Sequence, residues 1–331
     1  GIPGLVPSSL YNPEFVWEST KKLELGLELA FLNSRLQFEI SLYRNRSSNQ
    51  LVSYNMPYTT GFPSILSNFK ATVQNRGLEA LLRADLVTNK NWRWNVSFNL
   101  SVPRNKLVRF DGIESSSYVN LFKVGAPLSI QRLYGWAGVD PQTGLHTFID
   151  ENYDGLISDL DKKLMNPIDV KYYGGMNNTI QYKSFELSMQ FQASHRPGLR
   201  FLNGSMPGSS GNQAINVIDR WFLPNDQTDV QRFVSIGYPS SAYGQEAFIA
   251  YRNAFDSNYN MQNIFFIRLK SLSCSYSLVP KWTKLLKLQE AKLFIQGQNF
   301  MTITGYKGLD PETGYGLPPL RMLTAGIQIR L

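Results

Sequence analysis

The chain has 331 residues, of which 43% are hydrophobic, 13% aromatic and 18% charged, and this length suffices for one large domain or two ordinary ones. No apolar run reaches the roughly 18 residues of a membrane-spanning helix, and no Lys/Arg-led apolar stretch at the start indicates a signal peptide. One cysteine and two histidines exclude internal disulfides and argue against zinc or thiol chemistry, and the basic residues behind the net charge of +8 are too scattered for a nucleic-acid surface. We therefore expect neither an enzyme nor a nucleic-acid-binding protein.

Period-two alternation of apolar and polar residues is the strongest pattern in the chain. It first appears between Leu23 and Phe31, and it is clearest between Trp92 and Val102. In chain order, the predicted strands cover residues 19–32, 35–47, 73–87, 92–104, 171–182, 185–196, 263–279, 290–303 and 319–331. Helical spacing fits none of these segments well, so we predict an all-β protein.

The length of the strands and the chemistry of their polar faces indicate a membrane barrel. Strands of soluble proteins usually have about five or six residues, whereas a tilted strand that crosses a bilayer needs about nine to eleven. The polar faces favour Asn, Ser, Gln and Gly over charged residues, as the lining of a lumen does. Because an open sheet edge in hydrocarbon leaves backbone groups unpaired, such strands must close into a barrel.

Short and long connections alternate along the chain. Short turns lie at 33–34, 88–91 and 183–184 with a moderate one at 280–290, and long connections rich in Gly, Pro and Ser lie near 48–72, 105–170, 197–262 and 304–318. Outer-membrane barrels show this alternation, with short periplasmic turns and long external loops. The pattern predicts nine spans, and zero or two more inside 105–170, where Ser129 to Val139 and Leu145 to Asp150 form a candidate hairpin.

Two irregularities follow from this layout. Nine or eleven spans make an odd set, whereas single-chain bacterial barrels have even strand numbers, so we expect an incomplete barrel that closes with strands outside this sequence. In the strand 263–279, the apolar residues change parity between Leu269 and Leu272. A β-bulge near Lys270 and Ser271 would return the apolar residues on both sides of it to the same face of the sheet.

Short motifs in a fixed order resemble one family of transporters. They are Asn12-Pro13-Glu14 with Trp17-Glu18, Asn75-Arg76-Gly77, Gly135-Trp136 with Asp140-Pro141, Gly174-Gly175, Arg220-Trp221, and Gly297-Gln298-Asn299-Phe300. Their order and spacing over nearly the whole chain resemble the C-terminal portion of a SusC/RagA-type TonB-dependent outer-membrane transporter of Bacteroidetes. The expected fold class is therefore the C-terminal part of an antiparallel transmembrane β-barrel, about nine to eleven strands of a larger one, covering residues 1–331.

The resemblance also implies partners and a location. Such transporters have about 22 strands and an N-terminal plug, and they import oligosaccharides or peptides with a SusD-like surface lipoprotein. The expected location is the outer membrane of a Gram-negative, Bacteroidetes-like cell, in contact with its lipid. The sequence holds no plug and no TonB contact segment, so we expect the TonB complex to act through a missing N-terminal region.

Residues 150–161 fit the twelve-residue pattern of a calcium-binding loop. The predicted ligands are Asp150, Asn152 and Asp154 at positions 1, 3 and 5, the carbonyl of Leu156, Ser158 through water, and Asp161 at position 12. Asp161 departs from the pattern, because Glu normally binds with both oxygens there. The shorter side chain predicts weaker calcium binding or a shift towards magnesium. A solvated acidic turn is the alternative interpretation, and we expect no other cofactor.

Two further questions stay open from the sequence. Tyr243, Tyr251 and Tyr259 lie in the 197–262 connection, where aromatic rings stack on a glycan or pack against a partner protein. For the whole chain, the alternatives to an importer are a soluble or surface-attached all-β carbohydrate-binding module and, less favoured, a translocation barrel built from separate chains. The apolar alternation that ends at Leu331 favours a barrel.

Overall fold

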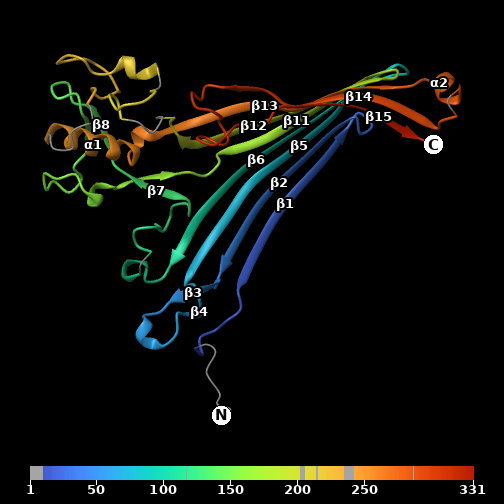
Figure 1. The fold of residues 1–331 in the computed structure, drawn as a ribbon. Helices are drawn as coiled ribbons and strands as arrows, with labels where there is room; N and C mark the ends of the chain where they lie inside the picture. Colours follow the sequence, from blue (N-terminus) through green and yellow to red (C-terminus); the bar gives the residue numbers. More distant parts are fainter. Residues whose placement is uncertain (1–9, 117, 202–205, 214, 235–241, 286) are drawn as a thin grey trace, which may run out of the picture. The chain divides into compact units, whose positions relative to one another are not determined.

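The computed structural model describes residues 10–331 except 117, 202–205, 214, 235–241 and 286. Its main element is a nine-stranded sheet in the order β1-β2-β5-β6-β11-β12-β13-β14-β15 (Figure 1). The strands are β1 (Ser19–Phe31), β2 (Leu36–Ser48), β5 (Ala71–Thr88), β6 (Trp92–Phe110), β11 (Tyr172–Tyr182), β12 (Phe185–Leu199), β13 (Met261–Ser277), β14 (Glu290–Thr304) and β15 (Met322–Arg330). The pairs β1–β2, β2–β5, β11–β12, β12–β13, β13–β14 and β14–β15 are antiparallel. The nine strands predicted from alternation are therefore confirmed, although β6 runs on to Phe110.

The chain forms two compact units, and each is described by itself. The first comprises Gly1–Ala84 and Ser97–Ser129, and the second comprises Asp85–Val96 and Ile130–Leu331. In the first unit, β3 (Leu51–Asn55) pairs with β4 (Ser64–Asn68) in a separate hairpin around η1 (Tyr58–Thr60). The buried cluster of this unit lies where β5 begins and β6 ends, against η2 (Ile113–Ser115). Its members are Ala71, Val73, Leu107, Phe110 and Ile113.

The apolar faces of the long strands are exposed rather than buried. Leu25 of β1 lies opposite Leu42 of β2, and Leu27 lies opposite Ile40. These four side chains are 38% to 67% exposed. A continuous apolar sheet face of this kind is unfavourable in water and favourable against lipid. Barrel walls need no apolar core beneath the strands, which explains why the buried residues gather in small clusters at the connections.

The connections of the second unit contain further small elements of their own. They are β7 (Ile130–Leu133), β8 (Trp136–Val139), β9 (His146–Phe148), η3 (Asp159–Asp161), β10 (Leu164–Pro167), η4 (Ile215–Asp219), α1 (Ala242–Phe255), η5 (Asn258–Asn260) and α2 (Pro280–Leu285). The candidate hairpin in 105–170 does form between β8 and β9. It lies outside the nine-stranded sheet, so the connection between β6 and β11 adds no span to that sheet.

A β-bulge interrupts β13 where the sequence predicted one. The pairing of β13 with β14 shifts between Leu269 and Ser271. Before the bulge, Ile264, Phe266 and Arg268 share one face and are buried, while Phe265 on the other face is 45% exposed. The bulge thus lets a strand with broken alternation keep one face apolar and exposed.

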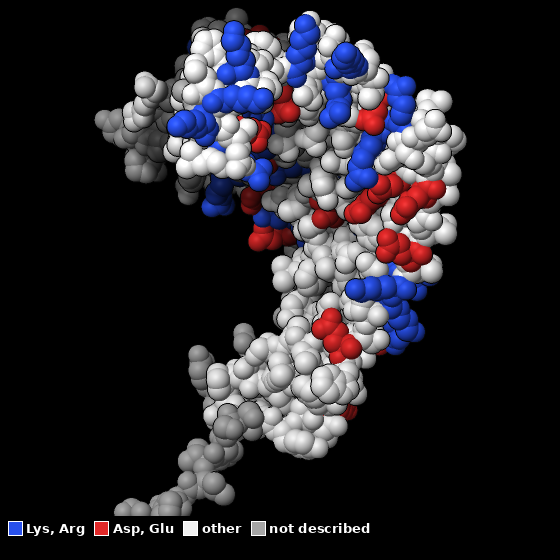
Figure 2. Space-filling view, turned by 90° about the vertical axis from the view of Figure 1, so that its right-hand side faces the viewer, with Lys and Arg blue, Asp and Glu red and all other residues white. Residues whose placement is uncertain are grey.

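Helix α1, with 14 residues, is the longest helix in the described part of the second unit, and strand alternation could not indicate it. Its buried positions include Ala247, Ala250, Tyr251 and Ala254, which recur at spacings of three and four. Among the described residues, no helix has both the length and the apolarity needed to cross a membrane. On the face in view in Figure 2, basic and acidic side chains lie interspersed, in agreement with the scattered basic residues of the sequence.

Candidate functional site

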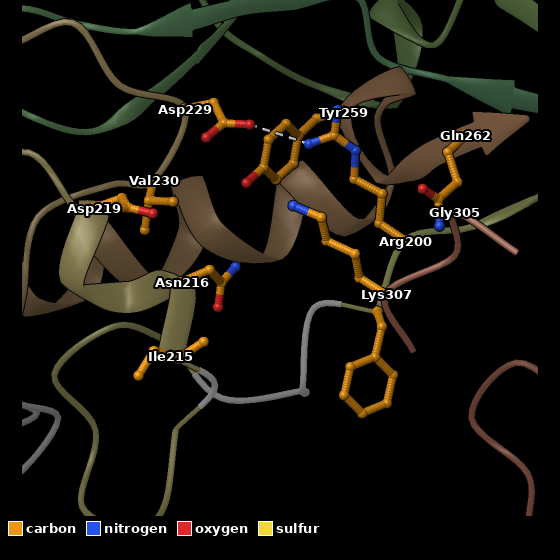
Figure 3. Close-up of a pocket in the computed structure, with 11 residues that line it drawn as sticks. Arg200, Ile215, Asn216, Asp219, Asp229, Val230, Tyr259, Gln262, Gly305 and Lys307 are labelled. Carbon is orange, nitrogen blue, oxygen red and sulfur yellow. Dashed lines mark hydrogen bonds and ion pairs between the residues drawn. The ribbon is translucent and has the colours of Figure 1, made fainter. Parts of the chain in front are cut away.

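A pocket of about 480 Å³ lies where two long connections of the second unit meet, the one between β12 and β13 and the one between β14 and β15 (Figure 3). Arg200 and Phe201 follow β12, Tyr259 and Gln262 precede or open β13, and Gly305 and Lys307 follow β14. The remaining lining residues are Ile215, Asn216, Asp219, Asp229 and Val230. Antiparallel neighbours place the end of one strand beside the start of the next, so residues distant in sequence converge here.

An ion pair and an aromatic ring build one wall of the pocket. Arg200 Nη1 lies 3.1 Å from Asp229 Oδ2, and the guanidinium lies 4.8 Å from the centre of the Tyr259 ring. Burial, together with the nearby Asp229 carboxylate, raises the pKa of the Tyr259 hydroxyl to about 12. Tyr259 therefore stays neutral at physiological pH and offers a ring face and a hydroxyl.

Two further charges in the pocket lack a partner among the described residues. The Lys307 ammonium extends towards Tyr259 and Asn216 (Figure 3). Lys307 and Asp219 take part in none of the ion pairs between described side chains. Beside the Arg200–Asp229 pair, the pocket thus offers one further cation, one further anion and aromatic rings, which suits a polar ligand that carries hydrogen-bonding or charged groups and has an apolar face.

A layer of aromatic side chains supports the pocket from behind. The Trp136 indole N–H donates to His146 Nδ1 at 3.1 Å, and the His146 ring centre lies 4.9 Å from that of Tyr259. Burial lowers the pKa of His146 to about 4. The imidazole is consequently neutral near pH 7, with its proton on Nε2 because Nδ1 accepts a hydrogen bond.

The fully buried Gln231 positions the segment that carries Asp229. Its Nε2 donates to the carbonyl oxygen of Ala247 at 3.2 Å, which fixes this segment on α1. Ala247 and Tyr251 of α1 pack with Met206 in the buried cluster of this region. The helix that alternation could not indicate is therefore what holds one wall of the pocket in place.

The six predicted metal ligands all belong to the 150–161 loop, where backbone amides donate to the carboxylates of Asp150, Asp154 and Asp161. Asp150 accepts from the amides of Tyr153 and Gly155 at 2.7 and 2.8 Å, and Asp154 accepts from that of Leu156 at 2.8 Å. Gly155 has φ +81°, as the sharp turn of such a loop requires. Asn152 Nδ2 donates to Asp154 at 2.8 Å.

Asp161 has a structural role whether or not an ion binds. It is fully buried and accepts from the amides of Glu151 and Ser158 at 2.9 and 2.8 Å. These hydrogen bonds lower its pKa despite burial. Ser158 and Asp161 also form the capping box of η3. Among the residues that the structure describes, no group of three or more Asp, Glu, His or Cys side chains is arranged to hold a metal, and the ion stays a prediction.

The three tyrosines of the 197–262 connection have different surroundings. Tyr259 lines the pocket. Tyr251 is only 8% exposed and packs in the cluster on α1. The side chain of Tyr243 lies outside the described residues. Stacking of Tyr259 on a ligand therefore stays open, whereas Tyr251 is part of the local core.

Arg200, Asp229 and Lys307 could not be predicted as site residues from the sequence. Single charged residues in long connections carry no periodic signal, and only the fold brings these three together. One available signal was the repeated pentapeptide Asp-Pro-Xaa-Thr-Gly at 140–144 and 310–314. In both copies the Asp carboxylate accepts from the backbone amides two and three residues later, at 2.9 and 2.6 Å for Asp140 and at 2.9 and 3.1 Å for Asp310.

Comparisons with known proteins agree with this fold. Residues 3–140 match the family model described as TonB dependent receptor-like, beta-barrel. The chain is 28% identical to TonB-dependent receptor P3 of Formosa agariphila, over 95% of this chain and 32% of that protein. It is 24% identical to TonB-dependent receptor SusC of Bacteroides thetaiotaomicron, over 93% of this chain and 31% of SusC. The chain thus spans about a third of the length of the curated relatives it matches.

Solved structures show the same similarity at the level of the fold. The structure of the RagAB peptide importer in the 'open-open' state matches with a TM-score of 0.77 and 23% identity, over 98% of this chain and 36% of that chain. The 'closed-closed' state matches with a TM-score of 0.74 and 22% identity, over 97% of this chain and 36% of that chain. The predicted resemblance to SusC/RagA-type TonB-dependent receptors is confirmed, as are the fold class, part of an antiparallel transmembrane β-barrel, and the outer-membrane location in a Bacteroidetes-like cell.

Proposed function

We propose that this chain forms the C-terminal wall and external loops of an outer-membrane TonB-dependent nutrient importer. The observation that best supports this proposal is the nine-stranded sheet with an exposed apolar face. Such a face requires contact with lipid, and the strands must close into a barrel so that no backbone group stays unpaired in the hydrocarbon. The similarity to TonB-dependent receptors supports the same conclusion. A soluble carbohydrate-binding module would leave Leu25, Leu27 and Leu29 in water, which disfavours that alternative.

The proposal includes the ligand and the partners of the whole protein. The imported ligand is an oligosaccharide or a peptide, a SusD-like lipoprotein covers the external end, and the TonB complex acts through a region outside this chain. The chain has no enzymatic role in this proposal. The pocket of Arg200, Tyr259 and Lys307 contacts the ligand, since it joins ring faces to unpaired charges in the long connections.

The mass of the native polypeptide tests the importer. Outer membranes from the source cell are probed with an antibody raised against the exposed 150–161 loop. A membrane species roughly three times the mass of this chain is expected, because the chain covers about a third of its relatives. If the antibody detects no protein in the outer membrane, the importer is contradicted and the soluble module is favoured.

Growth tests the role of the pocket. A strain that lacks the full-length gene is complemented with the Lys307→Gln and Asp219→Asn variants and grown on a mixture of maltooligosaccharides or on a casein digest. Both variants are expected to slow growth on one of the two sources. Lys281→Gln is the matched control, since Lys281 is an exposed lysine in the connection of moderate length between β13 and β14, remote from the pocket lining. Equal growth of all three variants would exclude the pocket as the ligand site.

We further propose that the 150–161 loop binds calcium or magnesium through Asp150, Asn152, Asp154, Leu156, Ser158 and Asp161. Support comes from the oxygen-rich set of side chains and from the left-handed Gly155 at the turn. In this proposal the ion has a structural role, because no α-helix flanks the loop.

A further inference from the structure

The connection from β14 to β15 folds back onto the sheet instead of extending away from it (Figure 1). Residues 305–316 of this connection are here named the strap. Tyr306 of the strap packs with Ile264 and Phe266 of β13 in a buried cluster. The ring of Tyr306 also lies over Gly308, where an added Cβ would come within 2.4 Å of it. The strap therefore covers the face of β13 opposite the exposed Phe265.

A buried arginine holds the strap on β13. Arg268 is 1% exposed, and its Nη2 and Nη1 lie 2.5 Å from Asp310 Oδ2 and 2.8 Å from Glu312 Oε2. Its Nε donates to Thr302 Oγ1 of β14 at 3.1 Å. All three guanidinium nitrogens are thus engaged, two by the strap and one by the wall. A charge this deeply buried is retained only with such compensation.

A second arginine holds the same turn through its backbone. Arg196 of β12 donates from Nη2 to the carbonyl oxygen of Pro311 at 3.1 Å and also to that of Glu312. Asp310 is the first residue of the Asp-Pro-Glu-Thr-Gly turn, whose amide hydrogen bonds make it a rigid unit. Two neighbouring strands therefore bind the same rigid turn: β13 binds its carboxylates through Arg268, and β12 binds its carbonyl oxygens through Arg196.

The far end of the strap is attached to the pocket itself. The Tyr315 hydroxyl donates to the carbonyl oxygen of Arg200 at 2.7 Å, and the Tyr315 and Phe201 ring centres lie 5.2 Å apart. Gly305 and Lys307 lie between the end of β14 and the gripped turn. The position of the Lys307 ammonium in the pocket therefore depends on where the turn is held.

From this geometry we propose that Arg268 is a positioning residue for ligand binding: it fixes the strap so that Lys307 presents its ammonium to the pocket. Arg268 does not line the pocket and acts through Asp310 and Glu312. The inference rests on the proposed function of the pocket. If this position contributed only to stability, buried apolar residues would stabilise the barrel wall at least as well. Paired charges, in contrast, specify a single arrangement of the strap.

Cysteine labelling in intact cells tests the placement of the strap. The full-length protein carries Cys274→Ser and Tyr306→Cys, and a membrane-impermeant maleimide reports how readily position 306, which is buried while the strap is held, is reached. Arg268→Met is expected to raise the labelling rate about tenfold, because labelling follows the population of released strap. Arg268→Lys, which keeps the charge, is expected to give an intermediate rate.

Lys270→Met is the matched control. Lys270 lies on the same strand and near the same Glu312, at 3.9 Å, but it is partly exposed, so its removal should leave the rate within about twofold of the parent. A reference cysteine in place of Leu160, which is 66% exposed and lies outside the predicted ligand set, should also be unaffected. Unchanged labelling at position 306 in Arg268→Met, or an equal rise at both positions, would overturn the inference. Should Arg268→Met fail to reach the outer membrane, Asp310→Asn is judged by the same criterion.

Growth on the two nutrient mixtures separates this inference from the proposed function. Reduced growth of both Lys307→Gln and Arg268→Met, with partial recovery in Arg268→Lys, supports both. Reduced growth of Lys307→Gln alone overturns the positioning role and leaves the pocket as the ligand site. Normal growth of both variants, with raised labelling in Arg268→Met, refutes the pocket as the ligand site.

Discussion

The indole N–H of Trp221 donates to the carbonyl oxygen of Pro141, 80 residues earlier in the chain, at 3.0 Å. The amide of Asn225 donates to the same oxygen at 2.8 Å. The Trp221 ring also occupies the space beside Gly144, where an added Cβ would lie 2.5 Å from a ring carbon. The first Asp-Pro-Xaa-Thr-Gly turn is therefore the point at which two long connections attach to each other, as the second turn attaches the strap to β12 and β13.

The two copies of this turn allow a matched pair of substitutions. Gly144 and Gly314 have φ values of +69° and +65°, so alanine costs about 1 kcal/mol of backbone strain at each. Only Gly144→Ala also meets Trp221, which adds about 1–3 kcal/mol of overpacking, whereas the nearest atom at Gly314 is 4.0 Å away. Limited proteolysis of the purified full-length protein should cut the 200–260 connection faster in Gly144→Ala than in Gly314→Ala. Equal cleavage would show that Trp221 does not hold this connection.

A second matched pair concerns strand glycines in the first unit. Gly77 of β5 lies opposite Tyr43 of β2, and an added Cβ would come within 2.7 Å of the Tyr43 side chain, whereas no atom lies within 4 Å at Gly26 of β1. We expect Gly77→Ala to destabilise by about 1–3 kcal/mol because the ring must leave the glycine. Gly26→Ala should be neutral or stabilising by about 0.5 kcal/mol, since alanine restricts the unfolded chain. The temperature at which the purified barrel loses its SDS resistance measures both, and a Gly26→Ala loss as large as that of Gly77→Ala would contradict the packing argument.

The stability of the aromatic layer behind the pocket is expected to fall in acid. His146 has a folded pKa of about 4 against about 6.5 in an unfolded chain. The unfolded state then takes up a proton before the folded state does, so stability is complete above pH 6.5 and is lost as the pH falls towards 4. Tyr251 and Tyr259 face the imidazole with neutral hydroxyls, and the Asp229 carboxylate opposes the shift in part.

Hydrogen exchange measures this loss. Corrected for intrinsic rates, protection of residues 136–148 should fall by about thirtyfold between pH 7.5 and pH 5, which corresponds to about 2 kcal/mol. His146→Asn keeps an acceptor for Trp136 and cannot titrate, so its protection should be lower overall and nearly independent of pH. A wild-type profile as flat as that of His146→Asn would disprove the assigned cause.

Substitutions at two carboxylates of the 150–161 loop distinguish a role in metal binding from a role in folding. Asp154→Ala should abolish protection of the loop by calcium against proteolysis and leave the metal-free loop little changed, because Asp154 is exposed. Asp161→Ala should expose the loop with and without calcium, since three backbone amides lose their acceptor. Asp159→Ala is the control, as an exposed acid of the same loop outside the ligand set. Identical cleavage of wild type with and without calcium would show that the loop binds no calcium.

Local pattern was sufficient for the sheet. Each strand exposes one apolar and one polar face, and this demand repeats every second residue, so β1 at Ser19–Phe31 and the bulge beside Leu269 were both predictable. The resemblance to TonB-dependent receptors was equally readable, because ordered motifs survive in a single chain. Helix α1 was not predicted because the residues of the long connections were judged only for alternation, although Ala247, Ala250 and Ala254 share a helical face.

The site required the tertiary structure. Arg268 and Asp310 are separated by 42 residues, and nothing near either one marks it as half of an ion pair. Only the antiparallel arrangement of β12, β13 and β14 brings Arg196, Arg268 and the strap together and directs Lys307 into the pocket. The sequence by itself determined the elements that short-range alternation specifies, and the tertiary structure decided which charges meet, because such pairings depend on strand register and loop packing over distances that no local pattern encodes.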